Sequence, residues 1–228
     1  RKFMNKKAFT LIELVFVIVV AGILMTIAIP RFKKNDLDKA AEQIASHIRY
    51  TQHLAMQDDK FDPNDPNWYK KRWSITFNDT LIPDCGIDTG STGTWKYSVY
   101  SDTSLSGHLN SPSEPASNPN KNGYYLSAGW SGISGSDCKK IDEDLNLGKK
   151  YNISRIWLNN CGASNTRTIS FDELGRPMAS VSTTGGGGST RPYDRLLKQD
   201  CKITIQQTGW WHRKTITIAK ETGYVSIM

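Results

Sequence analysis

The chain has 228 residues, and 29 basic against 22 acidic side chains give it a formal net charge of +7. Four of the basic residues (Arg1, Lys2, Lys6 and Lys7) lie in residues 1–8, which hold no acid, so the rest carries 25 against 22, or +3. This charge is too small to indicate a nucleic-acid-binding protein by itself. Beyond residue 30 the chain is long enough for one sizeable domain with its own core.

The N-terminal region contains a long apolar stretch from Phe9 to Ile29, in which Glu13 is the single charged residue. A helix needs about 20 apolar residues to cross the hydrocarbon core of a bilayer. The basic residues ahead of the stretch form the flank expected on the cytoplasmic side. We therefore expect residues 9–30 to be a transmembrane half-helix. A carboxylate inside such a span is costly, and is usually paired and functional.

The start of this stretch resembles a known processing signal. The sequence KKAFTLIE at residues 6–13 resembles the cleavage and methylation signature of type IV pilins and type II secretion pseudopilins. The resemblance implies that a prepilin peptidase cuts between Ala8 and Phe9 and methylates the new amine of Phe9. It also implies that Glu13 pairs with this amine on a neighbouring subunit during filament assembly. Residues 1–8 are then a leader, for which Met4 fits the start codon.

Two other interpretations of the stretch explain less. An ordinary signal anchor accounts for the apolar run and the lysines but gives Glu13 no role. A cleaved secretory signal has a shorter core followed by its cleavage site, whereas the helical pattern here continues. The family most often has Gly before the cut, and the small Ala8 departs from it only slightly.

An amphipathic pattern follows Pro30. Apolar residues recur at three- and four-residue steps from Leu37 to Ala55, with charged residues on the other face, which predicts a helix over about Phe32–Met56. Pro30 removes a backbone donor and is expected to bend the helix without necessarily ending it. We assign residues 31–57 to the amphipathic half of one long helix, and its apolar stripe to core packing against a sheet.

The remainder, residues 58–228, reads as an antiparallel-sheet head domain. Alternating patterns of period two predict strands, and the predicted strands are Trp73–Phe77, Thr94–Tyr100, Ile153–Leu158, Thr166–Phe171, Cys201–Gln206, Lys214–Ile218 and Gly223–Ile227. The Ser-, Pro- and Asn-rich stretch 101–122 predicts a long surface loop. The predicted fold class is α+β: a long N-terminal helix with a meander of antiparallel strands packed on its second half.

The C-terminal strands carry a second resemblance. A Gly-Arg turn at Gly175-Arg176 follows one strand, and a final strand pair closes on a turn at Gly223. This order is similar to the GspH/FimT-type minor pseudopilins, whose fold is pilin-like. Residues 60–150 match no family pattern.

The four cysteines Cys85, Cys138, Cys161 and Cys201 lie far apart in the sequence. In an oxidising periplasm they predict two disulfides, with three possible pairings. We favour Cys85–Cys138 and Cys161–Cys201, because each pairing joins neighbouring segments. Zinc needs more closely spaced ligands.

No catalytic motif and no cofactor motif is present in the sequence. It has no H-E-x-x-H, no G-x-S-x-G and no phosphate-binding loop, since the glycine run 185–188 lacks a following Gly-Lys. The carboxylates at 137–144 do not follow a calcium-loop order and are flanked by lysines, so we expect a solvated loop and no metal. We predict that the protein is not an enzyme and binds no cofactor.

The principal hypothesis is therefore a minor pseudopilin, a low-copy subunit of a type II secretion pseudopilus. The resemblance implies a single-pass protein of the bacterial inner membrane with its C-terminal domain in the periplasm. Its implied partners are sister pseudopilins or pilins, a prepilin peptidase and the inner-membrane assembly platform.

Two alternatives remain open. One is a FimT-like DNA receptor, with Trp210, Trp211, Arg213 and Lys214 as possible DNA contacts, because aromatic and basic groups adjoin there. The near-neutral head argues against it, and an amphipathic hairpin turn is the preferred interpretation of these residues. The other alternative is a major type IV pilin, which a long, loop-rich and cysteine-bridged head suits less well.

Overall fold

The computed structural model describes residues 10–163, 165–184, 188–209 and 212–228. The chain divides into two compact units, residues 1–36 and 37–228. The helix α1 (Leu11–Gln57) begins in the first unit and ends in the second, and Pro30 does not end it. Within the described part of the chain, no helix is both long enough and apolar enough to cross a membrane.

The second part of α1 forms the centre of the head core, as its apolar stripe predicts. Ala40, Ala41, Ile44, Ala45 and Ile48 are fully buried and recur at the spacing of one helix face. Their small or aliphatic side chains allow both sheets to pack closely on the helix. They share one continuous core with apolar residues from seven of the eight strands.

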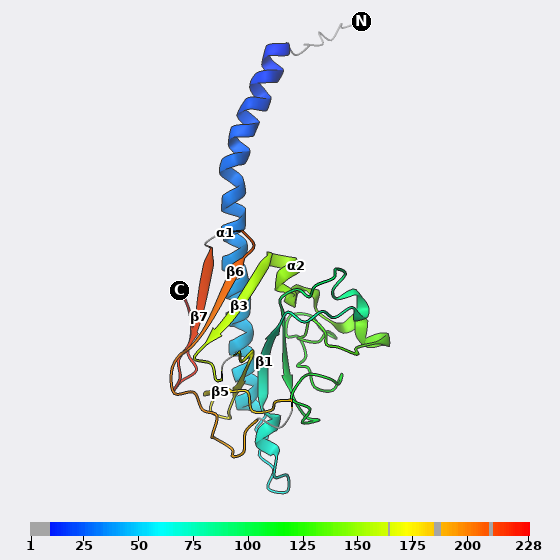
Figure 1. Ribbon diagram of the computed structural model, residues 1–228, viewed down its shortest axis with the longest axis vertical. Coiled ribbons are helices and arrows are strands. Elements are labelled where there is room, and N and C mark those ends of the chain that lie inside the picture. Colours follow the sequence, from blue (N-terminus) through cyan, green and yellow to red (C-terminus); the bar gives the residue numbers. More distant parts are fainter. Residues whose placement is uncertain (1–9, 164, 185–187, 210–211) are drawn as a thin grey trace, which may run out of the picture. The chain divides into compact units, whose positions relative to one another are not determined.

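The head contains two antiparallel sheets of four strands each, which confirms the predicted α+β class (Figure 1). The first sheet has the order β2-β1-β4-β5, with β2 (Lys96–Ser101), β1 (Trp73–Asn78), β4 (Thr168–Phe171) and β5 (Pro177–Ala179). The second has the order β3-β6-β7-β8, with β3 (Ile153–Asn159), β6 (Cys201–Gln207), β7 (Arg213–Ile218) and β8 (Val225–Ile227).

The expectation of a single meander is wrong, because the chain changes sheet between β3 and β4. β3 pairs with β6, whereas β4 pairs with β1 and β5. Alternation along a strand shows which residues face the core but not which strand lies alongside, so the sequence pattern does not contain this split. The sequence does not predict β5. This strand has three residues and begins with Pro177, so it is too short to show a period-two pattern.

Short helical turns occupy the connections. They are η1 (Trp68–Lys71), η2 (Asp84–Gly86), η3 (Gly135–Lys140), η4 (Glu143–Leu145) and the five-residue helix α2 (Leu147–Tyr151). Gln52 of α1 joins the two glycine turns of the C-terminal region. Its Nε2 donates to the carbonyl oxygens of Gly175 and Gly223, at 3.0 and 2.8 Å.

The prediction that the stretch 101–122 is a long surface loop is wrong in part, because some of its side chains are buried. Leu109, Glu114 and Ala116 are buried, and the backbone of Val99 in β2 bonds to Ala116 and Leu126 at 2.9 Å each. The stretch therefore covers the edge of β2 with main-chain hydrogen bonds, which its low-hydrophobicity sequence does not reveal. A second apolar cluster lies beneath it, made of Ile82, Ile87, Tyr100, Leu109, Trp130, Ile133 and Ile141.

Candidate functional site

The first part of α1 presents apolar side chains to solvent. From Leu11 to Met25 they are mostly exposed, with Phe16 at 69% and Leu24 at 61%. A continuous apolar surface of this kind is an interaction surface, because a soluble monomer rarely leaves one uncovered. Glu13 lies on this part of the helix, in its first turn.

Thr10 and Glu13 together form the start of the helix. The Thr10 Oγ1 accepts a hydrogen bond from the backbone N–H of Glu13 at 3.3 Å, and α1 begins at Leu11. Thr10 is thus the N-cap and Glu13 the third helical residue, the spacing of a capping box. An acid in the first turn also complements the positive end of the helix dipole. The T-x-x-E pattern at Thr10–Glu13 is the sequence signal for this local role. Ala8 and Phe9 lie outside the described residues.

The four cysteines form two disulfides, Cys85–Cys138 and Cys161–Cys201, with sequence separations of 53 and 40 residues. The first joins η2 to η3 beside the second apolar cluster, and the second joins the end of β3 to the start of β6. Each bond therefore fixes a segment that secondary structure alone would leave loosely held.

The structure does not bring Arg213 and Lys214 together. They are neighbours in β7 and so point to opposite faces of the sheet. Lys214 Nζ pairs with Asp38 of α1 at 2.9 Å, whereas the exposed Arg213 donates from Nε to Gln206 Oε1 at 3.1 Å. Trp210 and Trp211 lie outside the described residues. The aromatic neighbour of Arg213 in the structure is Trp157 of β3, with 5.1 Å between the guanidinium and the indole centre. Lys214 does not take part in this contact.

The carboxylates of the 137–144 segment are held by lysines. Lys121 pairs with both Asp142 and Asp144, and Lys140 pairs with Asp137 at 3.0 Å. The hydrogen bond to Asp142 raises the pKa of Lys121, and the bond from Lys121 lowers the pKa of Asp144. Asp142 is only 4% exposed, so the expectation of a solvated loop is wrong for this residue. Among the described residues, no group of three or more His, Cys, Asp or Glu side chains is arranged to hold a metal ion.

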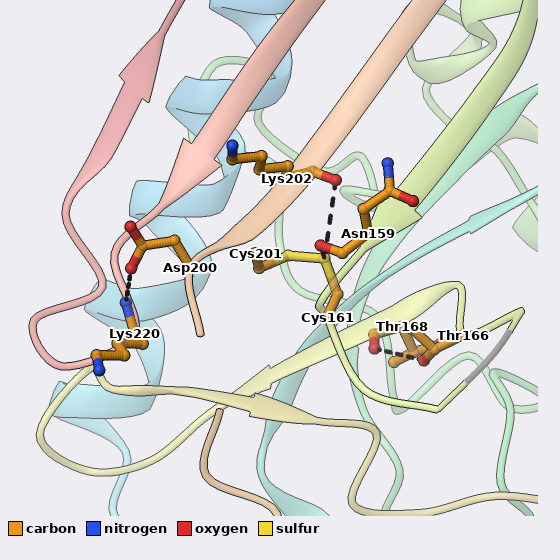
Figure 2. The surroundings of a disulfide bond; sticks show 8 residues. All are labelled: Asn159, Cys161, Thr166, Thr168, Asp200, Cys201, Lys202 and Lys220. Atoms are coloured by element: carbon orange, nitrogen blue, oxygen red, sulfur yellow. Dashed lines mark hydrogen bonds between the residues drawn. A yellow bond between two sulfur atoms is a disulfide. The ribbon is translucent and has the colours of Figure 1, made fainter. Parts of the chain in front are cut away.

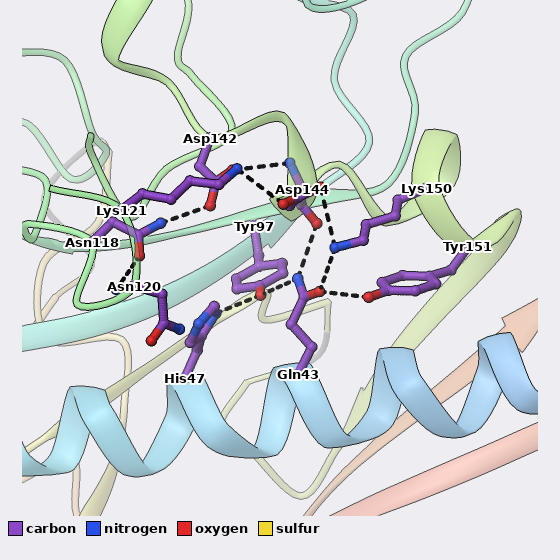
Figure 3. Close-up of polar contacts among 10 residues, drawn as sticks. All are labelled: Gln43, His47, Tyr97, Asn118, Asn120, Lys121, Asp142, Asp144, Lys150 and Tyr151. Carbon is purple, nitrogen blue, oxygen red and sulfur yellow. Dashed lines mark hydrogen bonds and ion pairs between the residues drawn. The ribbon is translucent and has the colours of Figure 1, made fainter. Parts of the chain in front are cut away.

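These carboxylates belong to a polar network that reaches α1 (Figure 3). Gln43 Nε2 donates to Tyr97 OH at 2.8 Å and to the backbone oxygen of Asp144 at 3.0 Å, while Tyr151 OH donates to Gln43 Oε1 at 2.7 Å. His47 Nδ1 lies 2.6 Å from Tyr97 OH. Gln43 and Tyr97 thus join the helix to both the β2 strand and the 118–151 region.

His47 is neutral in this network. Burial lowers the pKa of His47 to about 4, against an opposing attraction from Asp142 and with a smaller lowering from Lys150. Burial also raises the pKa of Tyr97 far above its ordinary value. Because Tyr97 accepts from Gln43, its hydroxyl proton is free to bond the unprotonated Nδ1 of His47. These hydrogen bonds connect α1, β2 and α2, so the network acts as a structural connection within the head.

The architecture and the N-terminal motif of the chain agree with each other. An N-terminal helix followed by antiparallel sheets packed on its second part is consistent with the pilin-like fold. Residues 3–29 match the family model described as "Prokaryotic N-terminal methylation motif". Neither a curated protein nor a solved structure matches the chain. The chain therefore has the N-terminal motif of type IV pilin-type proteins, which are structural subunits, and the match does not extend to the head.

Proposed function

We propose that the protein is a minor pseudopilin that assembles through its N-terminal helix into a periplasmic pseudopilus of a type II secretion system. The observation that carries the proposal is the methylation motif at residues 3–29, followed by a helix whose apolar side chains are exposed. Such a surface is stable in lipid or against the helices of sister subunits. The two disulfides of the head suit an oxidising periplasm.

In this proposal the chain has four functional segments. Residues 1–8 are the leader removed by the prepilin peptidase, and residues 9–30 are the half-helix held in the inner membrane. Residues 31–57 are the amphipathic half, and residues 58–228 are the periplasmic head. The assembly platform of the inner membrane and sister pseudopilins are the partners. A low-copy place in the pseudopilus is favoured by the long, disulfide-bridged connections of the head.

Processing is tested by co-expressing the full chain with a prepilin peptidase and measuring the mass of the product. We expect a chain that begins at methylated Phe9. Co-expression with a catalytically inactive peptidase is the control and should leave the chain intact. An uncut chain with the active peptidase would overturn the pilin-type interpretation and leave an ordinary anchor.

Assembly is tested by two variants that separate the roles of Glu13. Glu13→Gln removes the charge but retains a residue that a capping box accepts at this position, whereas Thr10→Ala removes the cap and retains the charge. We expect Glu13→Gln to abolish co-purification of sister pseudopilins and Thr10→Ala to preserve it. Co-purification that is kept in Glu13→Gln and lost in Thr10→Ala would show that Glu13 acts only on helix formation. Co-purification of the wild type with DNA but no sister subunit would contradict the secretion proposal.

A further inference from the structure

One face of the second sheet carries basic and aromatic side chains that come together only in the folded chain. Arg155 of β3 lies opposite Gln206 of β6, which lies opposite Arg213 of β7, and Trp157 lies opposite Thr204 in the next exposed row. We call this surface the basic sheet face; it consists of Arg155, Trp157, Asn159, Lys202, Thr204, Gln206 and Arg213. The alternate residues of these strands, such as Ile203 and Ile205, are buried in the core.

Trp157 fixes the position of two guanidinium groups. Arg155 and Arg213 lie over its indole ring at 5.4 and 5.1 Å from the ring centre. The Nε of Arg213 is further held by Gln206. A guanidinium stacked on an aromatic ring keeps the N–H groups along its edge available to an anion. Arg155 and Arg213 are both exposed.

Two adjoining hollows flank Trp157. The larger, of about 620 Å³, is lined by Arg155, Arg167 and Trp95 together with Asn159, Asn160 and Asn165. The smaller, of about 330 Å³, is lined by Trp157, Asn159, Thr204 and Arg213. Trp157 and Asn159 border both hollows, so an extended ligand could occupy the two at once.

The charges of this surface are predominantly positive. Among the described residues that line either hollow, Asp79 is the one carboxylate, and Arg167 pairs with it. The exposed Lys202 lies opposite Asn159 in the sheet and adds a further positive charge. Arg155 and Arg213 therefore face the solvent with uncompensated charge, which attracts an anionic partner.

The loop that forms one wall is anchored covalently. Cys161 comes directly after Asn160 and is bonded to Cys201, the first residue of β6 (Figure 2). Asn160 and Asn165 adopt left-handed backbone conformations, with φ of 60° and 63°, which asparagine tolerates better than most residues. The disulfide thus fixes the chain directly beside Asn160, so this part of the wall does not need to form on binding.

We propose that the basic sheet face and its two hollows bind an acidic polysaccharide whose successive sugars carry carboxylates. The guanidinium edges match carboxylates, and the asparagine amides and Thr204 hydroxyl match sugar hydroxyls. Single-stranded nucleic acid is favoured less, because it relies on bases stacking on open aromatic faces and Trp157 is already covered by two guanidiniums. The inference concerns the head alone and does not depend on pseudopilus assembly.

The test measures binding of oligogalacturonate to the full chain in detergent by isothermal titration calorimetry. Methyl-esterified oligogalacturonate of the same length removes the carboxylates and keeps the sugar backbone, and oligo(dT) tests nucleic acid. The variants are Arg155→Gln and Arg213→Gln, both at exposed positions, so that the fold should be retained. The control is Arg191→Gln, an exposed arginine that lines neither hollow.

We expect the acidic oligosaccharide to bind and its methyl ester to bind at least about tenfold more weakly. Each of Arg155→Gln and Arg213→Gln should weaken binding by about the same factor, whereas Arg191→Gln should not. The proposal is overturned if the wild type does not bind, if the ester binds equally well, if the control variant weakens binding as much, or if oligo(dT) binds more tightly. Far-ultraviolet circular dichroism of each variant verifies that it has folded.

Discussion

Acidification should destabilise the head through one histidine. In the folded chain the pKa of His47 is lowered from 6.5 to about 4 by burial, whereas in the unfolded chain the ring is hydrated and has its ordinary pKa. Between these two values the unfolded state therefore binds one more proton than the folded state. The part of the folding stability that depends on uncharged His47 is fully present above pH 6.5. It is lost as the pH falls and is gone by about pH 4.

The size of the loss follows from the pKa difference. A shift from 6.5 to about 4 corresponds to about 3 kcal/mol, since each pKa unit is equivalent to about 1.4 kcal/mol. The carboxylates that are paired with lysines lose their stabilising effect only below pH 3.8, because the pKa values of Asp88 and Asp144 are lowered from 3.8 in the folded chain. The histidine effect thus has a pH window of its own.

The assay is urea unfolding of the full chain in detergent over a series of pH values, with His47→Gln as the test variant. Glutamine does not titrate. The unfolding free energy of His47→Gln should therefore vary across this pH window by about 3 kcal/mol less than that of the wild type. His53→Gln is the control, because His53 lies on the same helix with an exposed side chain. Parallel pH profiles for the wild type and His47→Gln would refute the reasoning.

Three further predictions concern the head. Lys96→Met should cost about 3–5 kcal/mol because it leaves Asp88 buried without its cation, and the double variant with Asp88→Asn should recover part of the loss in thermal unfolding. Replacing Cys161 and Cys201 by alanine should lower the unfolding free energy by about 4 kcal/mol for this loop, and unchanged urea midpoints would contradict the role given to the bond. Gly223→Ala should destabilise by more than about 1 kcal/mol, because φ is 67° and a Cβ would lie 2.1 Å from the Gln52 amide; chemical denaturation that gives equal stability would refute this.

The sequence predicts the elements of this fold better than their arrangement. The apolar stripe from Leu37 to Ala55 predicts the helix and its buried face because side-chain direction in a helix depends only on local spacing. The partners of a strand depend on the whole chain. For this reason the sequence does not show that Arg155 and Arg213 lie over the same Trp157 ring. The alternation of side chains along a strand could have shown that Lys214 points to the opposite face from Arg213.

The candidate assembly residues illustrate a different limit. Glu13 stands out in the sequence because a lone charge in an apolar stretch is costly. This cost indicates that Glu13 needs a partner but does not identify it. The hydrogen bond between Thr10 and the backbone of Glu13 is a local contribution that the charge argument does not include. The network of His47 and Tyr97 was not foreseen for the same reason as the sheet order, since Gln43, Tyr97 and Tyr151 are separated by more than fifty residues at each step.

The covered edge of β2 has a consequence for association between copies of the chain. Its backbone groups bond to Ala116 and Leu126 of its own chain, so this side of the sheet has no open ladder to which a strand from another copy could add. The first sheet therefore cannot be continued along that edge by a strand from a second copy of the chain, so any association between copies has to use another surface.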